Sequence, residues 1–458
     1  MVNILLQVQR ITQYMYGLHH SKRLWHNIAI FRLDETKIEK SEPPAPRPRE
    51  RVQTFRALRY RDFRLLWVSL LISGIGTWMQ IVAQSLLILK ITHGSAFALG
   101  VVSLAQALSF FLFALIGGSV ADRIDKRRFL LVTQSLSMLL AFLLGVLTYI
   151  GVIQVWMIVL LAFCSGCILS FDQPARAALI PMLVPRADLM NAISLQSMVF
   201  NGSAVLGPTL AGITIGLTGY AGNFFLNAVS FLGVLVVLFA LRVPHDAVAS
   251  NTARGNASIL ISIGAALRTV RQDPVLPWVL SGYAALLFFN PSATIILPVF
   301  AVQILHLSAV ELGLLFSASG IGTLAGALIV SSLGDVKRKG ALLLGALLLW
   351  TGALILFAIS HSLWLSMLAL FIFGSTQNAI ATTVITLMQT RVPPQMRGRV
   401  MSLNSLMVMG VRPLGDFPAG AAIALIGGPL TVLISAAIIG AYTLFLLFGR
   451  PAIRRLEG

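Results

Sequence analysis

Long apolar stretches, separated by short polar connections, follow one another along the chain from about residue 63 to residue 448. Leu104–Ile116 and Leu343–Ala358, for example, contain no charged residue. About 20 consecutive apolar residues span a bilayer as a helix, and a helix satisfies its own backbone hydrogen bonds in lipid. The strands of a membrane β-barrel would instead alternate between apolar and polar residues. The pattern therefore predicts an all-α, polytopic membrane protein.

Charged and turn-forming residues divide these stretches into twelve predicted membrane helices. Their limits are 63–89, 97–120, 129–150, 155–180, 190–216, 220–241, 276–304, 309–333, 340–359, 362–386, 398–424 and 427–448. We expect two six-helix bundles, at 55–244 and 276–450, joined by a cytoplasmic linker at 245–275 and followed by a short tail at 451–458. Within the linker, Ser258–Gln272 has the pattern of an amphipathic surface helix.

The first 54 residues differ from the rest of the chain, because they are polar, basic and contain several prolines. They hold no apolar core long enough for a signal peptide. We expect residues 1–54 to be a disordered N-terminal extension, or to reflect a start codon placed too far upstream.

The composition agrees with a membrane protein, because 57% of the residues are hydrophobic and 11% are charged. A water-soluble protein carries about a quarter charged residues. The net charge of +18 would suit a nucleic-acid-binding protein, but the positions of the basic residues explain it differently. Lys and Arg cluster in alternate connections, whereas the connections between them hold almost only Lys90. This asymmetry predicts an inner-membrane protein with both termini in the cytoplasm and no nucleic-acid partner.

The two predicted bundles share a sequence repeat. At an offset of 213 positions, Ser95, Ala96, Leu99, Gly100, Ala105 and Asp122 match Ser308, Ala309, Leu312, Gly313, Ala318 and Asp335. At an offset of 208 positions, Leu206, Gly207, Ala211 and Gly212 match Leu414, Gly415, Ala419 and Gly420. The shared order of the matches indicates two homologous halves with the same orientation. Parallel repeats of this kind build transporters that hold a substrate between their halves near the membrane midplane.

Three motifs resemble a known superfamily. The loop Gly118-x-x-x-Asp122-Arg123-x-Asp125-Lys126-Arg127-Arg128 resembles the cytoplasmic loop signature of the major facilitator superfamily. The sequence "GPTLAG", with Gly207, Pro208 and Gly212, resembles the motif of its antiporter branches, although Ser203 and Ala211 replace two of the usual glycines. The stretch 171–197, "FDQPARAALIPMLVPRADLMNAISLQS", is similar to the secretion-effector branch, which includes enterobactin exporters and macrolide efflux pumps.

The resemblance covers about residues 55–450 and implies the twelve-helix fold of that superfamily, with two pseudo-symmetric bundles. It also implies a latch between the bundles on the cytoplasmic side. In this latch, Asp122 would face the start of the eleventh helix, and Asp335 the start of the fifth. A carboxylate at a helix N-terminus is stabilised by up to about 1–2 kcal/mol. The predicted latch residues are Gly118, Asp122, Arg123, Asp335, Arg397 and Arg399; the alternative is that this charged cluster only sets the membrane topology.

Two pairs of charged residues lie inside predicted membrane helices, where an unpaired charge is costly. Asp172 and Arg176 are four positions apart, as are Arg412 and Asp416. Residues at this spacing share a helix face and could form an ion pair. Each pair is therefore either a neutralised structural pair or a site where the carboxylate takes up and releases protons.

In superfamily members, the first, fourth, seventh and tenth helices line a central cavity. Six polar residues lie near the middle of these helices in this chain, namely Gln80, Gln84, Asn290, Thr294, Gln377 and Asn378. Such side chains can orient a substrate, or they can form hydrogen bonds between helices. Pro291 and Pro298 predict a break in the seventh helix, and Ser308 with Glu311 predicts a capping box at the start of the eighth.

The sequence holds no phosphate-binding loop of the G-x-x-x-x-G-K-[ST] type and no nucleophile–base or metal-binding constellation. Cys164 and Cys167 are interpreted as small residues for helix packing. We therefore expect a monomeric secondary transporter, not an enzyme, without metal or other cofactor. Its expected partners are the lipid bilayer, protons and an exported amphipathic small molecule. The alternatives are a lysophospholipid flippase or importer of the same fold, and a membrane sensor or scaffold that does not transport.

Overall fold

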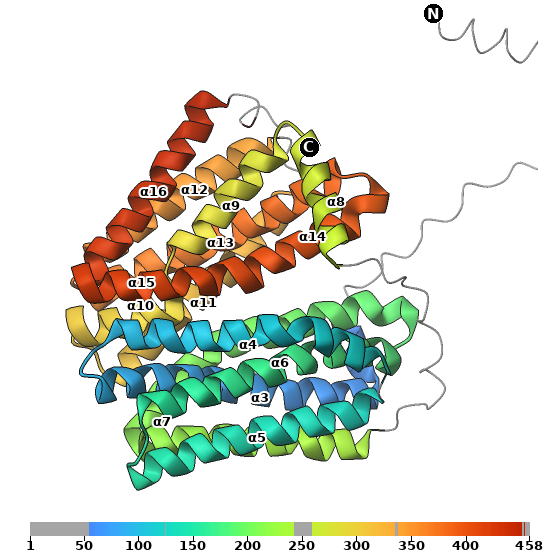
Figure 1. Cartoon of the computed structure of the whole chain (residues 1–458), viewed down its shortest axis with the longest axis vertical. Helices are drawn as coiled ribbons and strands as arrows, with labels where there is room; N and C mark the ends of the chain where they lie inside the picture. Colours follow the sequence, from blue (N-terminus) through green and yellow to red (C-terminus); the bar gives the residue numbers. More distant parts are fainter. Residues whose placement is uncertain (1–54, 124, 242–258, 335–337, 451–452, 454–458) are drawn as a thin grey trace, which may run out of the picture. The chain divides into compact units, whose positions relative to one another are not determined.

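The computed structural model describes residues 55–123, 125–241, 259–334, 338–450 and 453 (Figure 1). Side chains at 115–123, 259–263 and 409 are not described. The predicted extension at 1–54 and the predicted latch residue Asp335 therefore lie outside the described residues.

The described chain is helical, and its elements fall into the two predicted halves. The first half contains α3 (Arg61–Ile91), α4 (Ala96–Arg123), α5 (Lys126–Ile150), α6 (Val155–Leu183) and α7 (Leu189–Ala240). The linker contains α8 (Ile259–Gln272). The second half contains α9 (Leu276–Phe289), α10 (Ala293–Val299), the π-helix η4 (Phe300–Ile304), α11 (Ala309–Ser332), α12 (Lys339–Ala358), α13 (Leu363–Arg391), α14 (Arg397–Leu406), the π-helix η6 (Met407–Val411), α15 (Arg412–Ile426) and α16 (Gly428–Gly449).

Ten helical segments of the described chain are long and apolar enough to cross a membrane, and one of them folds back on itself. Gly219 within α7 has a φ of 69°, which glycine adopts without strain. Asn223 Nδ2 donates a hydrogen bond to the Ala211 carbonyl at 3.2 Å. In a straight helix these two residues would be about 18 Å apart. The chain therefore reverses at Gly219, and α7 contains both the fifth and the sixth predicted helices.

The seventh and eleventh predicted helices are interrupted. The break between α9 and α10 falls at residues 290–292, as the position of Pro291 predicts. In the eleventh, α14, η6 and α15 follow one another without a gap. The seventh helix is already among the ten segments, so the reversal in α7 and the addition of the eleventh helix make the described elements consistent with the predicted twelve passes. The predicted capping box of Ser308 and Glu311 at the start of α11 is confirmed.

The two ends of the helices are distinguished by their connections. We call the end that carries Lys90 the Lys90 end, and the end that carries the Arg-rich and Lys-rich connections the basic end. Figure 1 shows α15 lying along α4, and α11 packs against α7 in the equivalent manner. These are the main contacts between the two bundles.

Glycines that the sequence repeat relates to one another form both crossings. A Cβ atom on Gly420 of α15 would lie 2.8 Å from the Ala96 carbonyl oxygen and 3.2 Å from the Cα of Gly100 on α4. A Cβ atom on Gly313 of α11 would lie 2.6 Å from the Pro208 carbonyl oxygen on α7. Close backbone approach at these points depends on residues without side chains.

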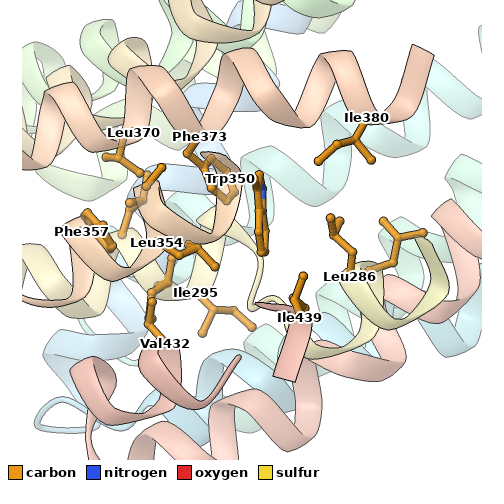
Figure 2. Close-up of a cluster of buried hydrophobic side chains, with 14 of the residues drawn as sticks. Leu286, Ile295, Trp350, Leu354, Phe357, Leu370, Phe373, Ile380, Val432 and Ile439 are labelled. Atoms are coloured by element: carbon orange, nitrogen blue, oxygen red, sulfur yellow. The ribbon is translucent and has the colours of Figure 1, made fainter. Parts of the chain in front are cut away.

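The interior of the second bundle is filled by apolar side chains (Figure 2). Trp350 of α12 is fully buried, and its ring lies 5.5 Å from that of Phe373 on α13. Phe300 stacks on Phe357 with ring centroids 4.5 Å apart. A small space of about 20 Å³ lies beside this packing, next to Asn290.

Candidate substrate cavity

A cavity of about 300 Å³ lies among the helices of the first bundle. Its described lining comes from α3, α4, α5, α6 and α7, with Thr294 and Ile295 of α10 contributed by the second bundle. Most of the lining side chains are polar, and they are Ser73, Thr77, Gln80, Gln84, Ser85, Ser103, Gln106, Gln134, Ser137, Ser165, Asp172, Arg176, Asn227 and Thr294.

Three of the six predicted cavity residues line this space. Gln80 and Gln84 project from α3, and the Gln80 Oε1 accepts a hydrogen bond from Asn227 Nδ2 at 2.7 Å. Thr294 Oγ1 shares a hydrogen bond with Ser292 Oγ at 2.7 Å. The contact between Gln80 and Asn227 joins two helices of one bundle, and a role of Gln80 in orienting a substrate remains a prediction.

The other three predicted residues do not line this cavity. Asn290 is buried at the break between α9 and α10, next to a small space of about 20 Å³. Gln377 and Asn378 are half-buried on α13, where Asn378 Oδ1 accepts a hydrogen bond from Thr382 at 3.3 Å. Their role in substrate binding remains a prediction.

Asp172 and Arg176 of α6 form the ion pair that their spacing allows, with Nη2 and Oδ2 2.5 Å apart. The other carboxylate oxygen, Oδ1, accepts hydrogen bonds from Thr133 Oγ1 at 2.8 Å and from Gln134 Nε2 at 2.7 Å. Three donors therefore contact the Asp172 carboxylate. Thr133 and Gln134, on α5, were not singled out from the sequence, although two adjacent polar residues inside an apolar helix are a usable signal.

Asp416 has different partners from those that its spacing suggested. Arg412 does not come within ion-pair distance of it. Instead, Oδ1 accepts a hydrogen bond from the Ser292 N–H at 2.9 Å, and Oδ2 accepts one from Ser103 Oγ at 2.9 Å. The Ser292 N–H is available because the break at Pro291 leaves it at the start of α10, without a helical acceptor. Since Ser103 belongs to α4, the buried carboxylate joins the two bundles.

The antiporter motif lies where α7 crosses helices of both bundles. A Cβ atom on Gly207 would lie 2.5 Å from the Cβ of Trp78 on α3. One on Gly212 would lie 2.4 Å from the Ala309 carbonyl oxygen on α11. Pro208 between them is buried. The motif therefore permits close packing at the junction of the two bundles.

The predicted latch is described in part. Gly118, Asp122 and Arg123 belong to the last turns of α4, where side chains are not described. Arg397 and Arg399 are exposed in the first turn of α14, and Arg397 Nε donates to the Val392 carbonyl at 3.4 Å. Contact between these arginines and Asp122 remains a prediction.

Two further groups of charges tie loops to helix ends at the basic end. Tyr60 donates a hydrogen bond to the Asp188 carboxylate at 2.6 Å, and this bond raises the pKa of the Tyr60 hydroxyl. Asp273 accepts hydrogen bonds from the Val275 and Leu276 N–H groups and pairs with Arg391 at 2.9 Å. Burial alone would raise the pKa of Asp273, but these donors outweigh it and hold the pKa below its usual value.

Comparison with known proteins gives consistent matches over most of the chain. A family model described as "Transmembrane secretion effector" matches residues 52–455. The multidrug efflux pump Tap of Mycolicibacterium fortuitum is 27% identical over 362 residues, which cover 78% of this chain and 88% of that protein. The enterobactin exporter EntS of Citrobacter koseri is 25% identical over 379 residues, which cover 82% of this chain and 88% of that protein.

Solved structures share the fold at much lower sequence identity. The crystal structure of the nucleoside transporter NupG matches with a TM-score of 0.67 and 13% identity, over 86% of this chain and 100% of that one.

Proposed function

Because the chain belongs to the transmembrane secretion effector family of the major facilitator superfamily, a family of membrane transporters, we propose that it exports an amphipathic small molecule across the bacterial inner membrane by alternating access, in exchange for protons. The names of its relatives as efflux pumps and siderophore exporters support export. The observation that carries the proposal is a polar cavity beside the junction of two homologous bundles, with a buried carboxylate that joins those bundles.

The basic end is the cytoplasmic end in this proposal, because Lys and Arg concentrate on the cytoplasmic side of bacterial membrane proteins. The close contacts that glycines make between the bundles lie between the Lys90 end and the level of Phe111 on α4 and Gly320 on α11. Gln303 adds a hydrogen bond to the Gly94 carbonyl at 2.7 Å at that end itself. The cavity is thus closed from the outside, and substrate enters it from the cytoplasm. The latch of Asp122 and Asp335 would close the cytoplasmic side in the opposite state.

Asp416 is the carboxylate best placed to couple protons to this motion. Asp172 is paired with Arg176 inside one bundle, so its partners stay the same when the two bundles move relative to each other. Asp416 receives one of its two hydrogen bonds from the other bundle, through Ser103. When the Lys90 end opens, the carboxylate loses this donor and meets outside water, and a buried carboxylate with fewer donors takes up a proton more readily. Closure restores the donor and releases the proton toward the cavity, which Ser103 lines.

An efflux assay tests the proposed function. Accumulation of a panel of dyes, macrolides and siderophores is measured in pump-deleted cells with and without expression of the chain. At least one compound should accumulate less on expression, and a protonophore should abolish the difference. If no compound responds, the export proposal fails.

A further inference from the structure

The charged residues of the cavity wall form one ion pair, and its arginine is the more exposed member. Asp172 and Arg176 are the charged residues of its described lining. The side chain of Asp172 is 6% exposed and its carboxylate is occupied by three donors, whereas the side chain of Arg176 is 25% exposed. The bond to Asp172 uses one nitrogen of the guanidinium, which carries five N–H donors in total. A solute in the cavity therefore meets the positive member of the pair.

One hydrogen-bond acceptor in the cavity wall has no partner in the described protein. Gln134 is 2% exposed and lines the cavity, and its Oε1 accepts no hydrogen bond there. Its orientation is fixed, because Nε2 of the same amide donates to the Asp172 carboxylate. Turning the amide over would place two acceptors against each other. Oε1 is itself buried from the cavity, so this amide positions the Asp172 carboxylate and offers no acceptor to a solute.

The remaining lining suits a polar solute. The side-chain amides of Gln84 and Gln106 and the hydroxyl of Ser137 face the same space, and Phe231 is the aromatic residue of the described lining. A lipophilic cation would need several aromatic faces or a free carboxylate, and the described cavity offers a guanidinium instead. The chemistry of this wall is complementary to an anion that also carries hydrogen-bond donors.

We propose that the cavity takes an anionic solute that also carries hydrogen-bonding groups, with Arg176 as its counter-charge. This assignment rests on the proposed transport function and names its substrate class.

Binding of two dyes of similar scaffold and opposite charge tests the charge. The purified full-length protein in lipid nanodiscs is titrated against 5-carboxyfluorescein, an anion, and rhodamine 123, a cation, with fluorescence anisotropy as the readout. Carboxyfluorescein should bind, and rhodamine 123 should neither bind nor compete. Arg176→Gln should weaken carboxyfluorescein binding at least tenfold, while Arg176→Lys should retain most of it.

Two control variants separate loss of charge from loss of folding. Asp172→Asn with Arg176→Gln removes both charges, so no buried carboxylate is left unpaired, and it should bind carboxyfluorescein as weakly as Arg176→Gln. Arg391→Gln breaks a matched Arg–Asp pair outside the cavity, whose arginine side chain is 27% exposed, and it should leave dye binding unchanged. Unchanged carboxyfluorescein binding in Arg176→Gln, or binding of rhodamine 123 alone, would overturn the proposal, as would binding of neither dye.

Efflux of a cationic compound in the cell assay, without binding of carboxyfluorescein, would leave export standing and overturn the substrate class. Absence of any efflux in that assay would count against the proposed function instead.

Discussion

Asp172 and Asp416 each lie four positions from an arginine inside a membrane helix, and their neighbours give them different roles. Asp172 is satisfied within one bundle by Thr133, Gln134 and Arg176. Asp416 is satisfied across the two bundles by a hydroxyl and a backbone N–H. A charge that is paired locally is constant through a rigid-body motion, whereas one whose partner moves away can respond to that motion.

The substitution Asp416→Asn tests this difference. It keeps the size of the side chain but removes the proton site, so exchange of substrate across the membrane should continue while uptake driven by a pH gradient is lost. Proteoliposomes loaded with substrate allow both rates to be measured on one preparation. Arg391→Gln is the control, since it removes an arginine that pairs with Asp273 outside the cavity, and it should retain gradient-driven transport. Gradient-driven transport by Asp416→Asn at the wild-type rate would exclude Asp416 as the coupling group.

Asp273 provides a prediction about pH at the basic end. Its pKa in the folded protein lies below the usual value, so the ionised form stabilises the junction of α8 and α9 above the usual carboxyl pKa. That contribution is lost as the pH falls through the lowered folded pKa. The thermal midpoint of Asp273→Asn should therefore be below that of the wild type at neutral pH, and the two should converge in acid. If the difference in thermal midpoint between the two proteins stays constant from pH 7 to pH 3, the ionised carboxylate is not the source of the stabilisation.

The helices of one bundle contact those of the other through glycines. Because close approach requires glycine at these positions, the sequence repeat is recognisable at both crossings. Gly100 and Gly313 are equivalent in the repeat, as are Gly212 and Gly420, and all four lie at the two crossings. Each crossing allows the backbones of α4 and α15, or of α7 and α11, to approach closely. Hydroxyl hydrogen bonds accompany this packing, such as the one between Thr209 and Ser317 at the crossing of α7 and α11.

A single methyl group at one crossing should disturb both stability and transport. In Gly313→Ala the new Cβ would lie 2.6 Å from the Pro208 carbonyl oxygen, so α11 and α7 must move apart. We expect a cost of about 1–3 kcal/mol, visible as a lower thermal midpoint of the purified protein, and reduced export at normal abundance. Gly345→Ala is the matched control, because a Cβ there meets nothing within 4 Å. Equal midpoints for the two variants would contradict the packing described here.

The membrane helices, one helix break and one helix start were predictable from the sequence. Apolar length located the membrane helices, Pro291 located the break in the seventh, and Ser308 with Glu311 located a helix start. The π-helices η4 and η6 were not predicted, since no local residue pattern demands them. The partners of Asp416 were also beyond the sequence, because a spacing of four fixes which face a side chain shares but not which other helix lies opposite.

For the whole molecule, the repeat predicted two homologous bundles, and the cavity departs from that symmetry. Trp350 and Phe373 pack inside the second bundle (Figure 2), while the first holds a cavity lined by amides and hydroxyls. The sequence indicated polar residues on both sides, and whether they face a cavity depends on how large neighbouring side chains pack. We infer that the first bundle determines substrate selectivity and that the second supplies Asp416, the group proposed to sense closure.

The central claim is that the bundles must separate at the Lys90 end during each transport cycle, and one cross-link tests it directly. Thr209 Oγ1 of α7 lies 2.6 Å from Ser317 Oγ of α11, so cysteines at both positions, in a chain lacking Cys164 and Cys167, can form a disulfide between the bundles. Ser360→Cys with Ser366→Cys, whose hydroxyls are 2.9 Å apart within the second bundle, is the control. The oxidised Thr209/Ser317 variant should not export, and reduction should restore export, whereas the control should export in both states. Export at the wild-type rate by the oxidised, fully cross-linked Thr209/Ser317 variant would contradict the account.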